Sequence, residues 1–96
     1  IYFVPNTFTP DNDEHNNLFK PIFTSGFDPY SYGLYIFNRW GELIFESHNT
    51  EYGWDGSYGE GLNFNCQEGV YTWKIEFKLY ENDDRAILHG HVNLLR

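Results

Sequence analysis

One segment constrains the fold of this chain more than any other: Gly69–Tyr80, with the sequence GVYTWKIEFKLY. Its residues alternate between apolar and polar, and a period of two indicates a β-strand with one dry and one wet face. The apolar set is Tyr71, Trp73, Ile75, Phe77 and Leu79, and the polar set is Thr72, Lys74, Glu76 and Lys78. Ala86–Leu95 alternates in the same way, with Leu88, Val92 and Leu94 expected on the inward side. Because a short polar stretch joins the two segments, they predict a β-hairpin.

A second hairpin is predicted over Tyr32–Ser47, YGLYIFNRWGELIFES. Asn38 suits the first position of a type I turn, and Gly41 can take the positive φ that closes the loop with a bulge. The apolar run before the turn is apolar on both faces, which predicts a central strand. Trp40, at the tip, is either an exposed interface anchor or a ring folded back over the sheet edge with Arg39 stacked on it. From the sequence we favour the folded-back ring.

The remaining strands are expected to be short. A proline interrupts each of Ile1–Phe8 and Leu18–Thr24, which places both at a sheet edge or bulge. His48–Glu68 is rich in Gly, Asn, Glu and Tyr and predicts a loop, with one short strand over Leu62–Asn65. Aromatic residues make up 21% of the chain and alanine occurs once, a composition that favours pleated surfaces over helices. We therefore predict an all-β fold, an immunoglobulin-like antiparallel sandwich of about seven strands.

Composition and charge argue against several classes of function. The chain has 96 residues, the length of one domain, and contains no Met, which predicts a piece of a longer protein. Its net charge of −8, with only 6 Lys and Arg residues, argues against a nucleic-acid partner, whose phosphates need basic side chains. No apolar run approaches the ~20 residues that span a bilayer. We expect a monomer when the domain is isolated, and no enzyme, because no Ser-His-Asp order or nucleophile elbow is present.

Two features of the loops carry local predictions. Trp54-Asp55-Gly56 predicts a turn in which Asp55 bonds the backbone while Trp54 closes one end of the sandwich. Cys66 is the only cysteine, so an internal disulfide is excluded. We expect it to be a loop residue without a role, since a reactive thiol would need a partner such as His nearby.

The polar stretch Asp11–Asn17 has two interpretations. Asp11 and Asp13, with Asn16 or Asn17, could offer oxygen ligands to Ca²⁺, because this cation prefers carboxylates and amide carbonyls. Against this, His15 stands where an oxygen ligand is expected, and the stretch has no turn glycine. The competing interpretation is a turn in which Asp and Asn side chains bond the backbone. The residues favour the turn, and calcium stays the alternative.

Motifs spread over the whole chain resemble a known family, the gliding motility-associated C-terminal domain of Bacteroidetes, which is the type B sorting domain of type IX secretion. They match that family's motifs in the same order. The main departure is in Asp11–Asn17, where the family's two glycines are replaced. The matching stretches are PNTFTPDNDEHNNLF (Pro5–Phe19), FNRWGE (Phe37–Glu42), WDG (Trp54–Gly56), GVYTWK (Gly69–Lys74) and GHVNLLR (Gly90–Arg96).

The resemblance implies an immunoglobulin-like fold and a function as an address, that is, a sorting signal for secretion. Residues 1–96 would be a single C-terminal sorting domain of a larger secreted protein, with no cofactor. The type IX translocon and an outer-membrane barrel of the SprF type would read it, so that an upstream passenger is exported and then held at the cell surface or released. We expect the reading surface to combine Arg39, Trp40 and Glu42 with a sheet edge. The alternative is a carbohydrate-binding or adhesive module that stacks sugars on exposed Trp and Tyr rings.

Overall fold

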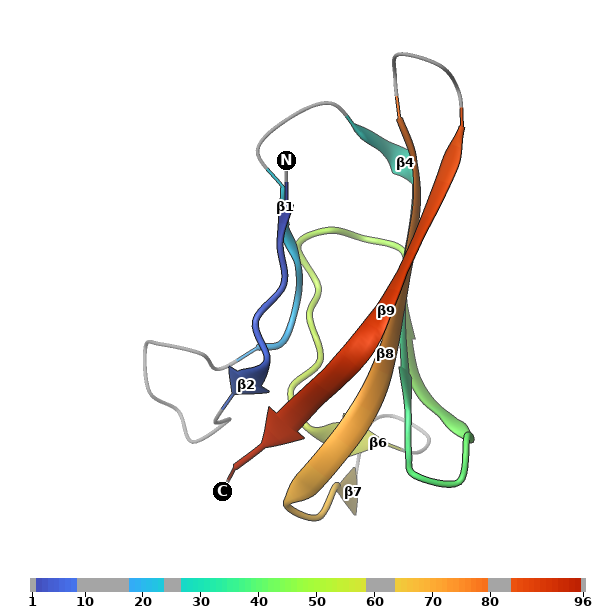
Figure 1. Cartoon of the computed structure of the whole chain (residues 1–96). Helices are drawn as coiled ribbons and strands as arrows, with labels where there is room; N and C mark the ends of the chain where they lie inside the picture. The colour runs from blue at the N-terminus through green and yellow to red at the C-terminus, as the bar shows by residue number, and fades with distance from the viewer. Residues whose placement is uncertain (1, 9–17, 24–26, 59–63, 80–83, 96) are drawn as a thin grey trace.

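The computed structural model describes residues 2–8, 18–23, 27–58, 64–79 and 84–95, and the regular secondary structure of these residues is entirely β (Figure 1). The prediction of an all-β chain is therefore confirmed. The strands are β1 (Tyr2–Phe3), β2 (Thr7–Phe8), β3 (Ile22–Phe23), β4 (Phe27–Phe37), β5 (Leu43–Ser47), β6 (Ser57–Tyr58), β7 (Phe64–Asn65), β8 (Gly69–Leu79) and β9 (Arg85–Leu94).

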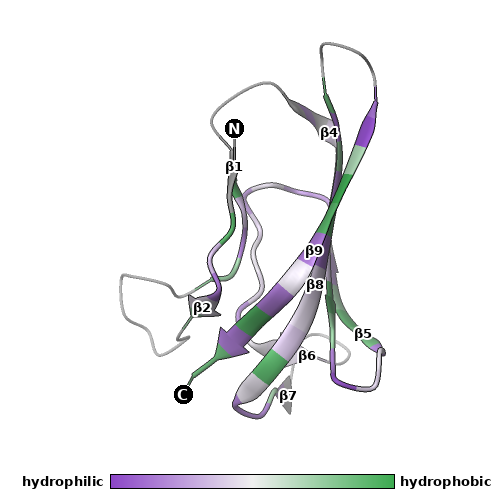
Figure 2. Cartoon of the chain, in the orientation of Figure 1, coloured by the Kyte–Doolittle hydropathy of each residue, from purple (hydrophilic) through white to green (hydrophobic). Residues whose placement is uncertain are grey.

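A five-stranded sheet in the order β2-β9-β8-β4-β5 forms the main layer. The longest pairing in this sheet is the β8–β9 hairpin. Its antiparallel register runs without a break from Gly69 opposite Leu94 to Lys78 opposite Arg85. β4 lies between β8 and β5, as its two apolar faces predict. Figure 2 shows hydrophobic and hydrophilic bands alternating along β9. The buried residues of the hairpin are Trp73, Ile75, Phe77, Val92 and Leu94, which confirms the predicted inward face.

The prediction of purely antiparallel sheets is wrong at one end of the main sheet. β2 runs parallel to β9, with Thr7 opposite Asn93 and Phe8 opposite Leu94. No turn joins these strands, because nearly the whole chain separates them, so only their packing decides the direction. Strand number differs as well, with nine strands instead of about seven in the described residues. Proline explains part of this, since Pro5 separates β1 from β2 and Pro21 directly precedes β3.

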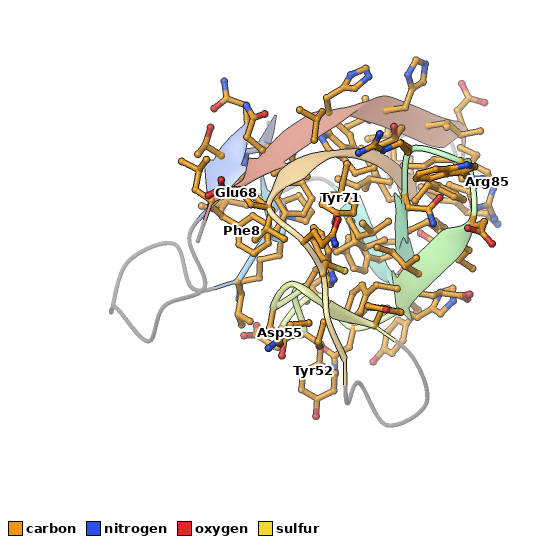
Figure 3. All side chains as sticks on the ribbon, turned by 90° about the horizontal axis from the view of Figure 1, so that it is seen from below. Phe8, Tyr52, Asp55, Glu68, Tyr71 and Arg85 are labelled. Carbon is orange, nitrogen blue, oxygen red and sulfur yellow. The ribbon has the colours of Figure 1, made fainter. Side chains whose placement is uncertain are left out.

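The layer opposite the main sheet is made of two small ribbons, β1–β3 and β6–β7, and of connecting segments. An isolated antiparallel bridge joins Phe19 to Trp54, with N–O distances of 2.8 and 2.9 Å. Gly53 permits this close approach, because a Cβ there would lie 2.7 Å from the carbonyl oxygen of Phe19. Figure 3 shows the sheet on one side and the segment carrying Asp55 on the other, with Phe8 and Tyr71 between them.

Aromatic rings fill the space between the layers. Trp54 is completely buried, and its ring centroid lies 5.2 Å from that of Phe8 and 5.1 Å from that of Tyr71. Its indole N–H donates to the carbonyl of Ser57 at 2.9 Å, so burial leaves no polar atom of the ring unpaired. Asp55 accepts hydrogen bonds from the backbone N–H and the hydroxyl of Ser57. The predicted bond from Asp55 to the turn backbone is confirmed, and Trp54 is a residue of the buried core.

Cys66 differs from its predicted place in a polar loop. It follows β7 directly and is buried, and its backbone N–H donates to the carbonyl of Gly56 at 2.7 Å. Small apolar side chains such as a thiol are often buried. The residue therefore belongs to the core rather than to the surface.

Candidate recognition site

The tip of the β4–β5 hairpin, Asn38–Glu42, is built around one side chain. The Asn38 side-chain oxygen accepts from the backbone N–H of Trp40 at 2.9 Å and from that of Glu42 at 3.0 Å. Its amide group donates to a carboxylate oxygen of Glu42 at 2.8 Å. Gly41 has a φ of 81°, and the register of β4 and β5 shifts between Ile36 and Phe37. The predicted turn and bulge are confirmed, and they make the tip a fixed rather than a loose structure.

Trp40 stands out from this tip, with 73% of its surface exposed. The guanidinium carbon of Arg39 lies 4.9 Å from the centroid of its ring, as predicted for a stacked pair. The prediction that the ring folds back over the sheet edge is wrong. The reason is geometric, since the Asn38-centred turn holds the backbone of Trp40 beyond the last paired residues of the sheet.

Two grooves flank Trp40. The larger holds about 450 Å³ and the smaller about 120 Å³, and both are lined in part by Asn38 and Trp40. The lining of the larger groove combines the aromatic residues Tyr58 and Tyr71 with polar side chains. The smaller groove runs along the start of β8 past Val70, which is exposed. The larger groove is lined by Asn38, Trp40, Glu42, Ile44, Tyr58, Asn65, Cys66, Gln67 and Tyr71.

Arg39 and Glu42, the other two predicted partner-binding residues, are both exposed on the same five-residue tip. The structure thus brings the predicted trio together. Their charges differ in how firmly they are held, because Glu42 is bonded to Asn38 while Arg39 is positioned by the Trp40 ring. The tip therefore exposes a cation, an indole ring and an anion close together.

His48 was not singled out by sequence reasoning. It follows β5, and its ring nitrogens lie 3.1 Å from the carbonyl oxygen of Tyr32 and 2.6 Å from a carboxylate oxygen of Glu46. Both partners can only accept, so both contacts are hydrogen bonds only when the ring carries two protons, as in the imidazolium form. The hydrogen bond to Glu46, and next the bond to the Tyr32 carbonyl, raise the pKa of His48 above its ordinary value.

The predicted calcium ligands Asp11, Asp13 and Asn16 lie outside the described residues. Calcium at this stretch therefore stays a prediction, which melting temperatures with and without millimolar Ca²⁺ would test, because a ligand of the folded state stabilises it. Where side chains are described, no group of three or more His, Cys, Asp and Glu is arranged to hold a metal ion. In that same part of the chain no helix is long and apolar enough to cross a membrane.

The comparison with protein families decides the relationship. The model of the CHU_C type IX secretion signal domain matches residues 2–94.

This chain belongs to the type IX secretion signal domain family.

The match confirms the resemblance drawn from the motifs, and it establishes that the type IX domain is a secretion signal, which implies export to the cell surface or the medium. A family of secretion signal domains is not known for catalysis. Neither the comparison with curated proteins nor that with solved structures gives a match.

Proposed function

We propose that this domain is the C-terminal address of a larger secreted protein and that the type IX translocon, with an outer-membrane barrel of the SprF type, reads it as a folded surface. Through this reading an upstream passenger crosses the outer membrane and is held at the surface or released. Membership of the secretion signal family supports the role. A folded signal is favoured because residues of both layers are needed to bury Trp54, so an unfolded segment could not present the same surface.

The observation that carries the choice of surface is the exposed Trp40 on a rigid tip. Interface anchors are enriched in Trp and Arg, and they cost least entropy when the free protein already holds them in place. Arg39 and Trp40 are stacked, and Asn38 fixes the backbone that carries them. We therefore assign Arg39, Trp40 and Glu42 to the contact with the machinery.

A fusion experiment tests this function. Residues 1–96 are attached to a fluorescent protein that carries an export signal and are expressed in a Bacteroidetes host with and without the translocon. Fluorescence at the surface or in the medium is expected only when the translocon is present. Equal fluorescence in both strains would falsify the proposed function.

Alanine variants test the surface separately. Arg39→Ala and Trp40→Ala should lower export while the melting temperature stays close to that of the wild type, because neither side chain is in the core. Tyr30→Ala is the matched control, since Tyr30 is 97% exposed and lies near the opposite end of β4. If export depends on the translocon but is unchanged in the tip variants, the domain is still a sorting signal and the choice of the tip as the contact surface is wrong.

The second candidate function, carbohydrate binding, is favoured by the larger groove beside Trp40. Ligand sites combine aromatic walls with a few polar groups, and this groove joins Trp40, Tyr58 and Tyr71 to Asn65 and Gln67. Its volume of about 450 Å³ would accommodate one or two sugar rings. Quenching or enhancement of tryptophan fluorescence by a panel of neutral mono- and disaccharides, lost in Trp40→Ala, would support this candidate. An unchanged spectrum throughout the panel would exclude those sugars.

A further inference from the structure

The main sheet ends in a strand with an open side. β5 is the last strand in the order β2-β9-β8-β4-β5, and among the described residues no strand pairs with its second edge. An edge strand presents unpaired N–H and C=O groups that can pair with another chain. The opposite end of the sheet is partly covered, because β2 pairs with the last residues of β9. β5 also lacks proline and lysine, the residues that most often block such pairing.

A hollow of about 720 Å³ lies beside this edge. One wall comes from β5 itself and the other from the turn that follows it and from Leu18. Leu18 and Tyr52 are exposed large hydrophobic residues, and Figure 3 shows Tyr52 pointing away from the sheet. Carboxylates stand at the same hollow. The lining residues are Leu18, Phe45, Glu46, Ser47, His48, Asn49, Glu51, Tyr52 and Gly53.

We infer that an extended segment of the secretion machinery pairs with β5 as an additional strand, places an apolar side chain in the hollow and brings a Lys or Arg to Glu46 and Glu51. This inference rests on the proposed function and names the chemistry of its partner. Strand addition supplies affinity through main-chain hydrogen bonds, while pockets for alternate side chains supply specificity. β5 and the adjoining hollow provide both.

Charge determines which kind of segment fits. Glu46 and Glu51 have local cationic partners, His48 at 2.6 Å and Lys20 at 4.0 Å, but these pairs are largely exposed and are worth little. An incoming cation can therefore replace them. A second copy of this chain fits badly, because edge pairing would bring two sets of these carboxylates together on molecules that each carry −8. A basic extended segment meets the opposite charge instead.

Site-specific crosslinking in the exported fusion of residues 1–96 tests the inference. The photoreactive residue p-benzoylphenylalanine replaces Tyr52 in one variant and Ile87 in the control, because Ile87 is exposed on β9, which β8 and β4 separate from β5. We expect the variant at position 52 to crosslink to a component of the type IX machinery, through a peptide that alternates apolar residues with Lys or Arg. Equal crosslinking from position 87, or none from position 52 while export is intact, overturns the inference.

Charge reversal provides an independent readout. The double variant Glu46→Lys, Glu51→Lys should lower both export and crosslinking about tenfold, the change expected of ~1.4 kcal/mol in binding. The control Asp84→Lys makes one such reversal at an exposed position beside the β8–β9 turn and should change neither. Melting temperatures show whether each variant is folded. If Asp84→Lys lowers export as much as the double variant, net charge rather than the β5 edge is responsible.

The two proposals fail in different ways. Export of the wild-type fusion without the translocon would contradict the proposed function and, with it, the strand addition. The strand addition alone would be contradicted if export depends on the translocon, is unchanged by the double reversal and gives no crosslink from position 52. In that case the tip variants Arg39→Ala and Trp40→Ala still test the surface assigned under the proposed function.

Discussion

The two hairpins of the main sheet each carry a tryptophan, and the two rings have opposite surroundings. In β8–β9, Trp73 is buried and lies across Gly90, where an added Cβ would come within 2.7 Å of the indole ring. Its indole N–H donates to the carbonyl of His91 at 3.2 Å. In β4–β5, Trp40 is mostly exposed, and the guanidinium carbon of Arg39 lies 4.9 Å from the centroid of its ring.

The difference follows from the position of each ring on its hairpin. Trp73 lies mid-strand on the face that packs against the second layer, whereas Trp40 lies in the turn, beyond the last paired residues. A ring in a turn has no facing layer to cover it. The comparison indicates that the β8–β9 ring stabilises the domain, whereas the ring at the β4–β5 tip contributes little to the core and is free for the contact that we propose.

The largest expected effect comes from removing the buried ring. Trp73→Ala should cost about 3–5 kcal/mol, because it leaves a cavity against Gly90 and the core. Small domains are stable by only ~5–15 kcal/mol, so much of the protein would unfold at moderate temperature. Trp40→Ala should leave the free energy of unfolding almost unchanged. Denaturant unfolding of both variants checks this, and similar losses would contradict the division of roles.

Gly90, which pairs with Trp73 from β9, provides a second test of how tightly the Trp73 ring is packed. Gly90→Ala forces the Trp73 ring to move, and overpacking of this kind costs roughly 1–3 kcal/mol. His89→Ala is the matched control, since it changes the preceding residue on the exposed face. Thermal melts of the two variants should differ clearly. A Gly90→Ala protein as stable as His89→Ala would show that the ring does not lie over the glycine.

A smaller effect is expected at the tip. Asn38→Ala removes the acceptor for two backbone N–H groups, and with about 1 kcal/mol per bond at an exposed site the global loss should be modest. The local effect should be larger, with faster hydrogen exchange of the Trp40 and Glu42 amides. Asn38→Asp keeps the accepting oxygen and should preserve their protection. Equal exchange in all three proteins would show that Asn38 does not fix the tip.

The smallest effect concerns pH. The pKa of His48 is raised in the folded protein, above its ordinary value of 6.5, by the bonds to Glu46 and to the Tyr32 carbonyl. Its stabilisation is therefore complete below 6.5 and is lost as the pH rises through the folded-state pKa. His48→Gln should reduce the fall in melting temperature over that range. An unaltered dependence of the melting temperature on pH in His48→Gln would show that the bonds of His48 do not contribute to it.

Several features could be predicted because they depend on neighbours in the chain. Alternation placed Trp73, Ile75 and Phe77 on one face, since side chains of a strand point to opposite sides in turn. Asn38 and Gly41 predicted the turn and bulge, since both act through local backbone geometry. The trio Arg39, Trp40 and Glu42 could be named from the same tip.

Other features depended on residues far apart in sequence. The parallel pairing of β2 with β9 and the Phe19–Trp54 bridge join distant segments, and no local pattern encodes their direction. The same holds for Gly53, whose lack of a side chain matters only because the Phe19 carbonyl approaches it. Burial of Cys66 was likewise decided by which segments cover it.

Local geometry thus determined the strands, their faces and the hairpin tip of this type IX signal domain, because each rests on steric and hydrogen-bonding preferences within a few residues. Only the tertiary structure decided that β5 became an open edge of the sheet. β5 has the residues of an ordinary inner strand, Leu43–Phe45 being apolar throughout. It ends the sheet because the chain after it turns into the opposite layer and β8 pairs with β4 instead.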